Sequence, residues 1–136
     1  MSYKIAVKEL KKTWKHSKIL KGKPPRVRQG DIFLAKLHDD LDELFPVVVV
    51  QTDKLNRLGF PSTIVVPCAK HKSKATELRH PIPSFRKVKF GPLTCMIDSL
   101  RMVNLRRLKN RIGCINETEI RMILKKVKRV LGRDPC

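Results

Sequence analysis

Two histidines in a basic stretch, His71 and His80, are the side chains in this sequence best suited to proton transfer near neutral pH. Lys54, Arg57 and Lys70 could supply positive charge beside them. Cleavage of RNA through its 2′-hydroxyl requires a base, an acid and a cation near the phosphate. The plainer interpretation makes both histidines ordinary surface residues, so the residue types alone leave the chemistry open.

Metal chemistry has little support in the sequence. The acidic stretch 38–45 holds four carboxylates and no Lys or Arg, and it could hold a hard cation. A solvated loop, or a clasp for a basic segment, is the commoner role of such a cluster. The four cysteines include no C-x-x-C pair, so we expect buried or reduced free thiols and predict neither a metal nor a cofactor.

The charge balance indicates a polyanionic partner. The chain of 136 residues carries 31 Lys and Arg against 12 Asp and Glu, a net charge of +19. RNA, DNA, an acidic peptide and an anionic membrane surface all satisfy that charge. At 5% aromatic residues, a broad base-stacking platform is excluded. No apolar run approaches the roughly 20 residues that span a bilayer, so we predict a cytoplasmic protein without a membrane partner.

Two apolar runs, Pro46–Gln51 and Ser62–Cys68, must form the centre of the domain. The first holds four successive valines, which suit a strand buried on both faces. Residues 28–37 predict a turn followed by another strand, and residues 91–103 predict a turn and two abutting strands. The three prolines within 81–92 place that segment at an edge, because each removes a ladder donor. A mobile basic connection is expected over 69–80.

The C-terminal helix has clear start, stripe and stop signals. Asn116 is the candidate N-cap, Glu119 follows three residues later, and Gly132 can take the C′ position. Six apolar residues recur at helical spacing and should cover the open face of the sheet: Ile120, Ile123, Leu124, Val127, Val130 and Leu131.

The first 28 residues form a basic extension, and residues 29–134 form the domain. Val7, Leu10 and Trp14 lie on one helical stripe, so the extension is expected to be partly helical. It could be a solvated tail whose Trp14 docks on the body, an arm for nucleic acid or an acidic partner, or a membrane-surface helix.

Several of these motifs together resemble the MazF/PemK toxin family. The run Pro46–Gln51 is followed by Asp53, Asn56-Arg57 and the run Ile64–Pro67, in the order typical of that family. Further along, Met96-Ile97-Asp98-Ser99-Leu100-Arg101 stands where family members have a Leu-Leu-Asp-Gln-Ile-Arg run. The resemblance covers roughly residues 28–132.

The resemblance implies a mainly β fold: an SH3-like small antiparallel barrel with a C-terminal α-helix, usually as a homodimer. Members are typically metal-independent endoribonucleases that act on single-stranded RNA. They are the toxin half of a toxin–antitoxin pair, and a disordered, often acidic antitoxin segment neutralises them.

Two family positions have lost their chemistry here. Members usually place an Arg before the proline of the core strand and a Thr after the next strand, and both can contact phosphate. Phe45 and Ala69 stand at those positions, and neither can donate a hydrogen bond or neutralise charge. The loop before Phe45 is also shortened and acidic, which should repel a phosphate backbone.

The candidate catalytic residues are therefore replacements, His71, His80 and Arg57. The basic side chains expected to bind nucleic acid are Lys54, Arg57, Lys70, Lys72, Lys74 and Arg101. An active toxin with a relocated site is the first hypothesis. The alternatives are a degenerate relative that binds nucleic acid or an antitoxin without cleaving RNA, and an inhibitor of DNA gyrase of the CcdB type.

Overall fold

The computed structural model describes residues 24–71, 73–82 and 92–133. The expected helical stripe around Trp14, and Lys72 of the predicted nucleic-acid-binding set, lie outside these ranges. The elements in chain order are β1 (Asp31–Ala35), β2 (Phe45–Val49), α2 (Asp53–Asn56), β3 (Ser62–Ala69), β4 (Arg79–Ile82), β5 (Leu93–Met96), η1 (Ile97–Ser99), β6 (Arg101–Asn104), η2 (Leu105–Arg107), β7 (Leu108–Cys114) and α3 (Glu117–Val130).

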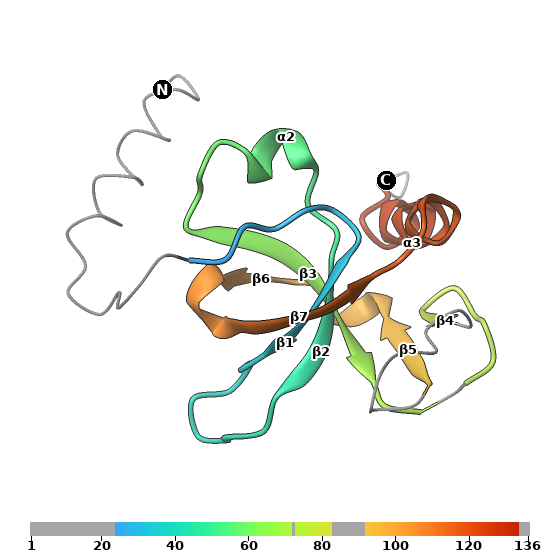
Figure 1. Cartoon of the computed structure of the whole chain (residues 1–136). Coiled ribbons are helices and arrows are strands. Elements are labelled where there is room, and N and C mark those ends of the chain that lie inside the picture. Colours follow the sequence, from blue (N-terminus) through green and yellow to red (C-terminus); the bar gives the residue numbers. More distant parts are fainter. Residues whose placement is uncertain (1–23, 72, 83–91, 134–136) are drawn as a thin grey trace.

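Seven antiparallel strands form one strongly bent sheet in the order β4-β5-β3-β2-β1-β7, and β6 also pairs with β3. The long strand β3 makes this possible, because its first half pairs with β6 and its end pairs with β5. Figure 1 shows the sheet curling around itself with α3 against one side. This confirms the predicted mainly β, SH3-like small barrel with a C-terminal helix.

The central strands are buried on both faces, as the valine run predicts. Val47 and Val49 belong to one apolar cluster, whereas Val48 and Val50 belong to the other. Strand side chains alternate between faces, so a run without polar residues supplies both clusters. The cluster with Val48 also contains Ile123 of α3, so the helix covers that side of the sheet.

Helix α3 begins as predicted but covers less than predicted. The Asn116 side chain accepts a hydrogen bond of 2.8 Å from the Glu119 N–H, so it is the N-cap. Ile120, Ile123 and Val127 are buried, yet Leu131 is 68% exposed. The last apolar residues, Val130 and Leu131, extend past the sheet, because α3 is longer than the surface it packs on.

Two boundaries differ from the sequence prediction. A 3₁₀ turn, η1, separates β5 from β6, so the strands over 91–103 do not abut directly. The connection expected over 69–80 ends early, because Arg79 and His80 are already in β4. Strand β4 does lie at the end of the sheet and contains Pro81, as the prolines indicate.

The buried cysteines Cys68 and Cys95 face each other across β3 and β5 with Sγ atoms 3.6 Å apart. Both are free thiols, as expected for reduced, buried cysteines. The hydrogen bond with Cys95, together with burial, raises the pKa of the Cys68 thiol well above its usual value. Cys68 is therefore a packed apolar group rather than a nucleophile.

A polar network fixes the connection between β2 and β3. The Asn56 side chain donates to the Gln51 carbonyl at 3.0 Å and accepts from the buried Thr63 hydroxyl at 3.0 Å. Asp53 accepts a 2.7 Å hydrogen bond from the Gln29 N–H, which ties the segment before β1 to α2. Asp53 and Asn56, the two polar residues of this connection that match the family motif, therefore stabilise the local structure through hydrogen bonds.

Candidate nucleic-acid interface

Phe45 and Ala69, which stand where family members have Arg and Thr, lie at the same end of the barrel. Strands β2 and β3 pair with Val47 opposite Pro67. Phe45 begins β2, two residues before Val47, and pairs with Ala35 of β1, whereas Ala69 ends β3, two residues after Pro67, and pairs with Thr94 of β5. The end of the barrel where the resemblance implies a phosphate site therefore has side chains without a hydrogen-bonding group at both positions.

Phe45 is held by its neighbours rather than projecting into solvent. It is half-buried and packs against the cluster that contains Phe33 and Val47. The His38 ring meets it edge to face, with ring centroids 5.8 Å apart at 86°. An exposed imidazole therefore stands beside the position of the missing Arg.

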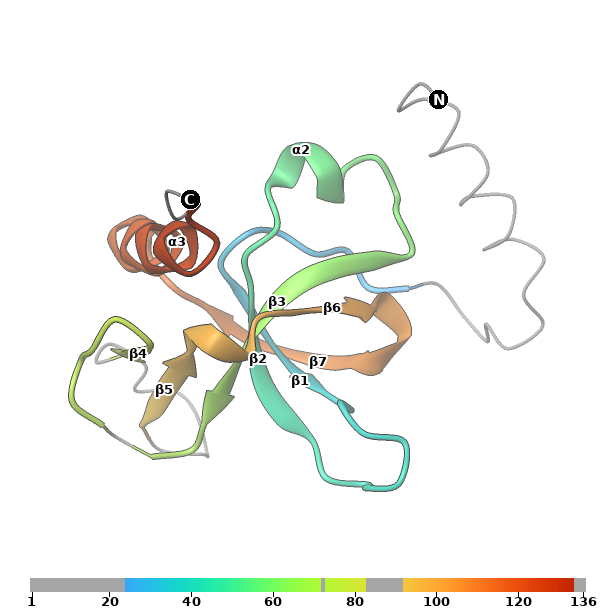
Figure 2. The same ribbon diagram turned by 180° about the vertical axis from the view of Figure 1, so that it is seen from behind.

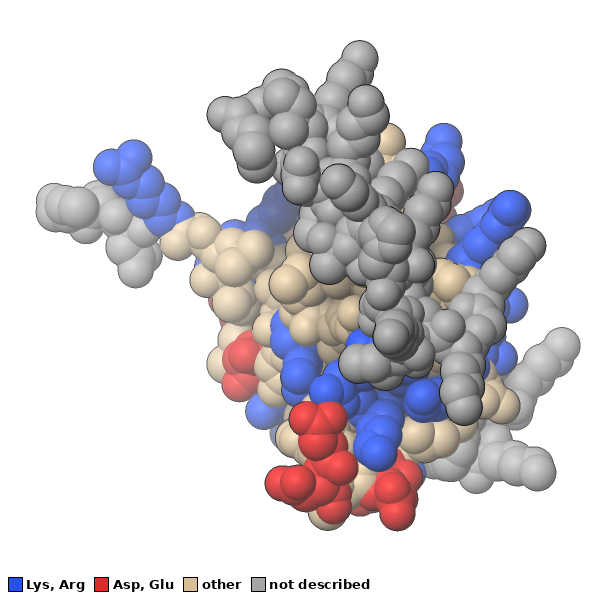
Figure 3. Space-filling model, turned by 90° about the vertical axis from the view of Figure 1, so that its left-hand side faces the viewer, with Lys and Arg blue, Asp and Glu red and all other residues tan. Residues whose placement is uncertain are grey.

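The segment between β1 and β2, residues 36–44, is here named the acidic loop. Its carboxylates fold back onto basic side chains: Asp39 contacts Arg107 at 2.6 Å, Asp42 contacts Lys36 at 3.8 Å, and Glu43 contacts Lys70 at 4.0 Å. Figure 3 shows the acidic groups gathered at one end of the molecule with Lys and Arg directly beside them. Of the interpretations of the acidic stretch, the structure favours the clasp.

Arg107 sets the strongest of these contacts. It donates to the Asp39 carboxylate and also to the Lys36 carbonyl at 3.1 Å, so it ties the loop to η2, directly before β7. The hydrogen bond from Arg107 lowers the pKa of Asp39 below its usual 3.8. Arg101 reaches the same loop from β6, where its guanidinium donates to the Leu37 carbonyl at 3.5 Å.

The connection after β3 provides the other predicted residues at this end. Lys70, His71 and Lys74 are exposed, and the Thr94 hydroxyl donates to the His71 carbonyl at 2.6 Å. Thr94 pairs with Ala69, so this bond holds the start of the connection beside the lost Thr position. Lys70 and Arg101 both reach the acidic loop, and His71 directly follows Lys70.

Lys54 and Arg57 lie elsewhere. They belong to α2 and its C-terminal end, and both are exposed. Figures 1 and 2 place α2 at the opposite end of the barrel from the acidic loop. The predicted nucleic-acid-binding residues therefore form two groups, and Arg57 is not near His71.

His80 is placed inside the fold. It is 3% exposed, its Nε2 contacts the Glu119 carboxylate at 2.5 Å, and its Nδ1 meets the Lys126 ammonium at 3.1 Å. Burial lowers the pKa of Lys126. His80 thus joins β4 to α3, and the structure does not bring it together with His71 or Arg57.

Metal-binding and membrane-spanning features are also absent from the described ranges. No group of three or more His, Cys, Asp or Glu residues there is arranged to hold a metal ion. In the same part of the chain, no helix has both the length and the apolar character needed to cross a membrane.

The sequence did not single out two contributors to this interface, His38 and Arg107, whereas Glu43 belongs to the acidic stretch for which a clasp was one expectation. His38 immediately precedes the first carboxylate of the acidic stretch, which was the available signal. Arg107 is 68 residues from Asp39 in the sequence, so no local pattern could join the two.

The fold and the interface define a small basic barrel with a cationic end partly covered by its own acidic loop. Residues 28–131 match the family model described as PemK-like, MazF-like toxin of type II toxin–antitoxin system. Because the match spans most of the chain, this protein belongs to that family.

Solved structures agree on the fold. The Mycobacterium tuberculosis toxin MazF-mt6 superposes with a TM-score of 0.60 at 15% identity, covering 74% of this chain and 95% of that one. A mycobacterial endoribonuclease in complex with its cognate antitoxin gives 0.66 at 12% identity, covering 81% and 99%. MazE–MazF from Deinococcus radiodurans gives 0.65 at 13% identity, covering 81% and 99%. None of the curated proteins compared with this sequence matches it.

Proposed function

We propose that this toxin-family protein binds single-stranded RNA at the end of the barrel beside the acidic loop and cleaves it without a metal ion. The observation that carries the proposal is the family match over residues 28–131 together with Lys70, Arg101 and Arg107 gathered at that end. An acidic antitoxin that covers the same cationic groups would neutralise it. The functional unit is a cytoplasmic homodimer.

The cleavage step uses groups beside Phe45. A histidine, His38 or His71, removes the proton from a 2′-hydroxyl, and the 2′-oxygen then attacks the adjacent phosphorus. The bond from phosphorus to the 5′-oxygen breaks, and a general acid protonates that oxygen. The products are a 2′,3′-cyclic phosphate and a 5′-hydroxyl end. Lys70 and Arg101 stabilise the negative charge that develops on the phosphate.

A second function has its own structural support. Phe45 and Ala69 offer no polar group at the start of β2 and the end of β3, and the carboxylates of the acidic loop pair with Lys70 and Arg107. A degenerate relative that binds RNA or an antitoxin without cleavage fits those two features. Gyrase inhibition by a CcdB-type mechanism is the remaining alternative.

The experiment that separates these functions is incubation of the full chain with a long mixed-sequence RNA in EDTA, followed by mapping of the ends. Discrete cuts that leave 5′-hydroxyl ends support the endoribonuclease. Intact RNA from a folded protein rejects it. Salt-sensitive RNA binding then supports the degenerate binder, and inhibition of supercoiling supports the gyrase inhibitor.

Restoring the lost groups gives a sharper prediction. In the double variant Phe45→Arg and Ala69→Thr, RNA cleavage should rise about 100-fold, because one preorganised donor to developing charge is typically worth that much. Initial cleavage rates per folded molecule measure the effect.

Leu41→Arg is the matched control, because Leu41 lies in the acidic loop four residues before Phe45, is 48% exposed and gains the same charge. Equal stimulation by Leu41→Arg, or no stimulation by the double variant, would contradict the placement of the site.

A further inference from the structure

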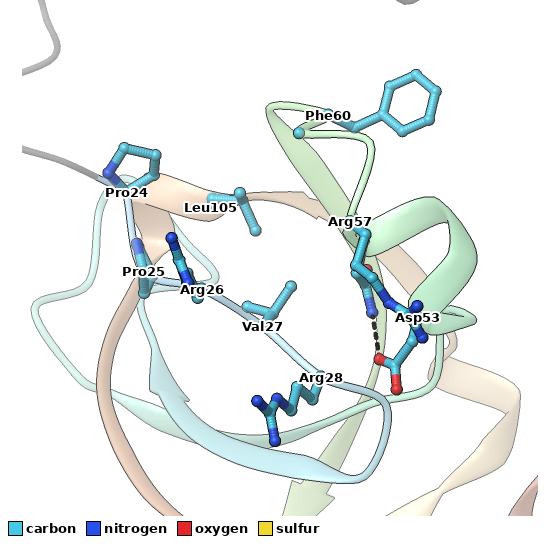
Figure 4. Close-up of a pocket in the computed structure, with 11 residues that line it drawn as sticks. Pro24, Pro25, Arg26, Val27, Arg28, Asp53, Arg57, Phe60 and Leu105 are labelled. Atoms are coloured by element: carbon cyan, nitrogen blue, oxygen red, sulfur yellow. Dashed lines mark hydrogen bonds between the residues drawn. The ribbon is translucent and has the colours of Figure 1, made fainter.

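A second site lies at the opposite end of the barrel, in a cavity of about 700 Å³. Segment 24–28 forms one side, and α2 with the turn after it forms the other, as Figure 4 shows. Residues 24–27 precede the part that matches the family model, so one wall of this cavity belongs to the chain's own extension. Its volume lies within the range typical of small-molecule pockets.

The cavity combines an apolar floor with a cationic rim. Val27 and Leu105 point toward one another in Figure 4; Val27 is half-buried and Leu105 is 8% exposed. The three arginines that line it are all exposed: Arg26, Arg28 and Arg57. Among the described residues, none of their guanidinium groups takes part in an ion pair.

Unpaired arginines around one cavity favour an anion with several oxygens. The planar guanidinium matches phosphate and carboxylate in a bidentate fork, which a lysine cannot do. Several arginines elsewhere in the described residues do have a carboxylate partner, as Arg79 does with Asp98 and Arg129 with Glu77. The rim of the cavity is therefore available to an external anion.

The α2 wall adds a hydrogen-bonding group that distinguishes the class of anion. Asp53 lines the cavity, and its Oδ1 accepts from the Gln29 N–H and, at 3.4 Å, from the Asn56 amide. These bonds orient the carboxylate and leave Oδ2 for a donor on the ligand. Sugar hydroxyls and base amino groups are such donors, whereas an acidic peptide side chain would be repelled by Asp53.

We propose that this cavity binds a nucleoside phosphate, with the phosphate on the arginines of the rim, the nucleoside over Val27 and Leu105, and a hydroxyl or amino group on Asp53. The ligand is either a free nucleotide or one nucleotide of a strand, because both present the same groups. The site lies at the far end of the molecule from the acidic loop, so it does not depend on RNA cleavage.

The test is a titration of the ¹⁵N-labelled full chain with AMP, ATP and a single-stranded RNA hexamer, followed by NMR. The variant Arg26→Gln/Arg57→Gln should weaken nucleotide binding by about tenfold or more, as expected for lost charge-assisted hydrogen bonds. The control Lys125→Gln/Lys128→Gln removes the same charge from exposed positions on α3 that do not line the cavity, and it should change binding less than twofold.

Saturable shifts at the amides of Val27, Gly59 and Leu105 with AMP or ATP would assign the site to free nucleotides. The same shifts with the hexamer alone would assign it to a strand. Absence of saturation at millimolar concentrations of all three would overturn the proposal, as would equal weakening in the control variant. Tighter binding of an acidic peptide than of nucleotide at these amides would also overturn it, in favour of a peptide site.

Discussion

His71 and His80 show how little the residue type decides at the scale of a single side chain. They lie nine positions apart in one basic stretch, yet His71 is exposed and His80 is 3% exposed. His80 receives both partners from α3, Glu119 and Lys126. A buried imidazole with both nitrogens occupied holds two elements together and has no free nitrogen for a substrate.

His80→Ala should lower the free energy of unfolding by about 2–4 kcal/mol, because it leaves a partly buried carboxylate and an ammonium without their partner. Urea unfolding measures this change. His71→Ala is the control, and it should change stability by less than about 0.5 kcal/mol because its side chain is exposed. Equal effects of the two substitutions would contradict the structural role of His80.

At the scale of elements, the acidic loop competes with any polyanion for the same cations. Its carboxylates pair with Lys36 at the start of the loop itself, with Lys70 after β3 and with Arg107 of η2. Each pair is exposed and individually weak. Together they place negative charge over the end of the barrel where RNA is proposed to bind, so the loop should lower RNA affinity.

The triple variant Asp39→Asn, Asp42→Asn and Glu43→Gln should therefore bind single-stranded RNA about tenfold more tightly at low salt, through removal of repulsion between like charges. Fluorescence anisotropy with a labelled RNA measures it. The control Glu77→Gln, Asp98→Asn and Glu117→Gln removes three exposed acids that form ion pairs elsewhere. An equal gain in the control would show that only net charge matters.

Lowering the pH to mildly acidic values should not reproduce the effect of the triple variant, because Asp39 keeps its charge there. Arg107 lowers the pKa of Asp39 below 3.8, so the unfolded state takes up its proton at a higher pH than the folded state. The contribution of this pair to stability is complete above the unfolded pKa and is lost as the pH falls through the lower folded value. At pH 5 the contact between Asp39 and Arg107 remains formed.

At the scale of the whole molecule, a net charge of +19 on a small barrel makes association with RNA sensitive to salt. Of the predicted nucleic-acid-binding residues, Lys70 and Arg101 reach the acidic loop, whereas Lys54 and Arg57 belong to α2 and its end, at the other end of the barrel (Figures 1 and 2). RNA bound at the proposed interface should therefore contact only the cations at the acidic-loop end.

The variant Lys70→Gln/Arg101→Gln should reduce the steepness of log K against log salt by about 1.4, because each lost phosphate contact on a single strand accounts for about 0.7. Affinities measured across a series of salt concentrations give the slope. The control Lys125→Gln/Lys128→Gln changes exposed residues of α3 and should leave the slope unaltered. A shallow slope in the unmodified protein would contradict RNA binding through phosphate contacts.

Local patterns were sufficient for most of the fold. Four adjacent valines require burial on both faces, Asn116 caps a helix with its own side chain, and prolines keep β4 at an edge. These features depend on near neighbours in the chain. The family motifs, and the net positive charge, are likewise properties of the sequence.

The composition of the candidate sites was decided by tertiary structure. Strand register pairs Phe45 with Ala35 and Ala69 with Thr94, and the course of the acidic loop brings Asp39 to Arg107. Packing of α3 on β4 turns His80 from a candidate catalyst into a buried link. Such encounters depend on how distant segments are packed, and local hydrophobic or charge patterns carry no information about which distant side chains will meet.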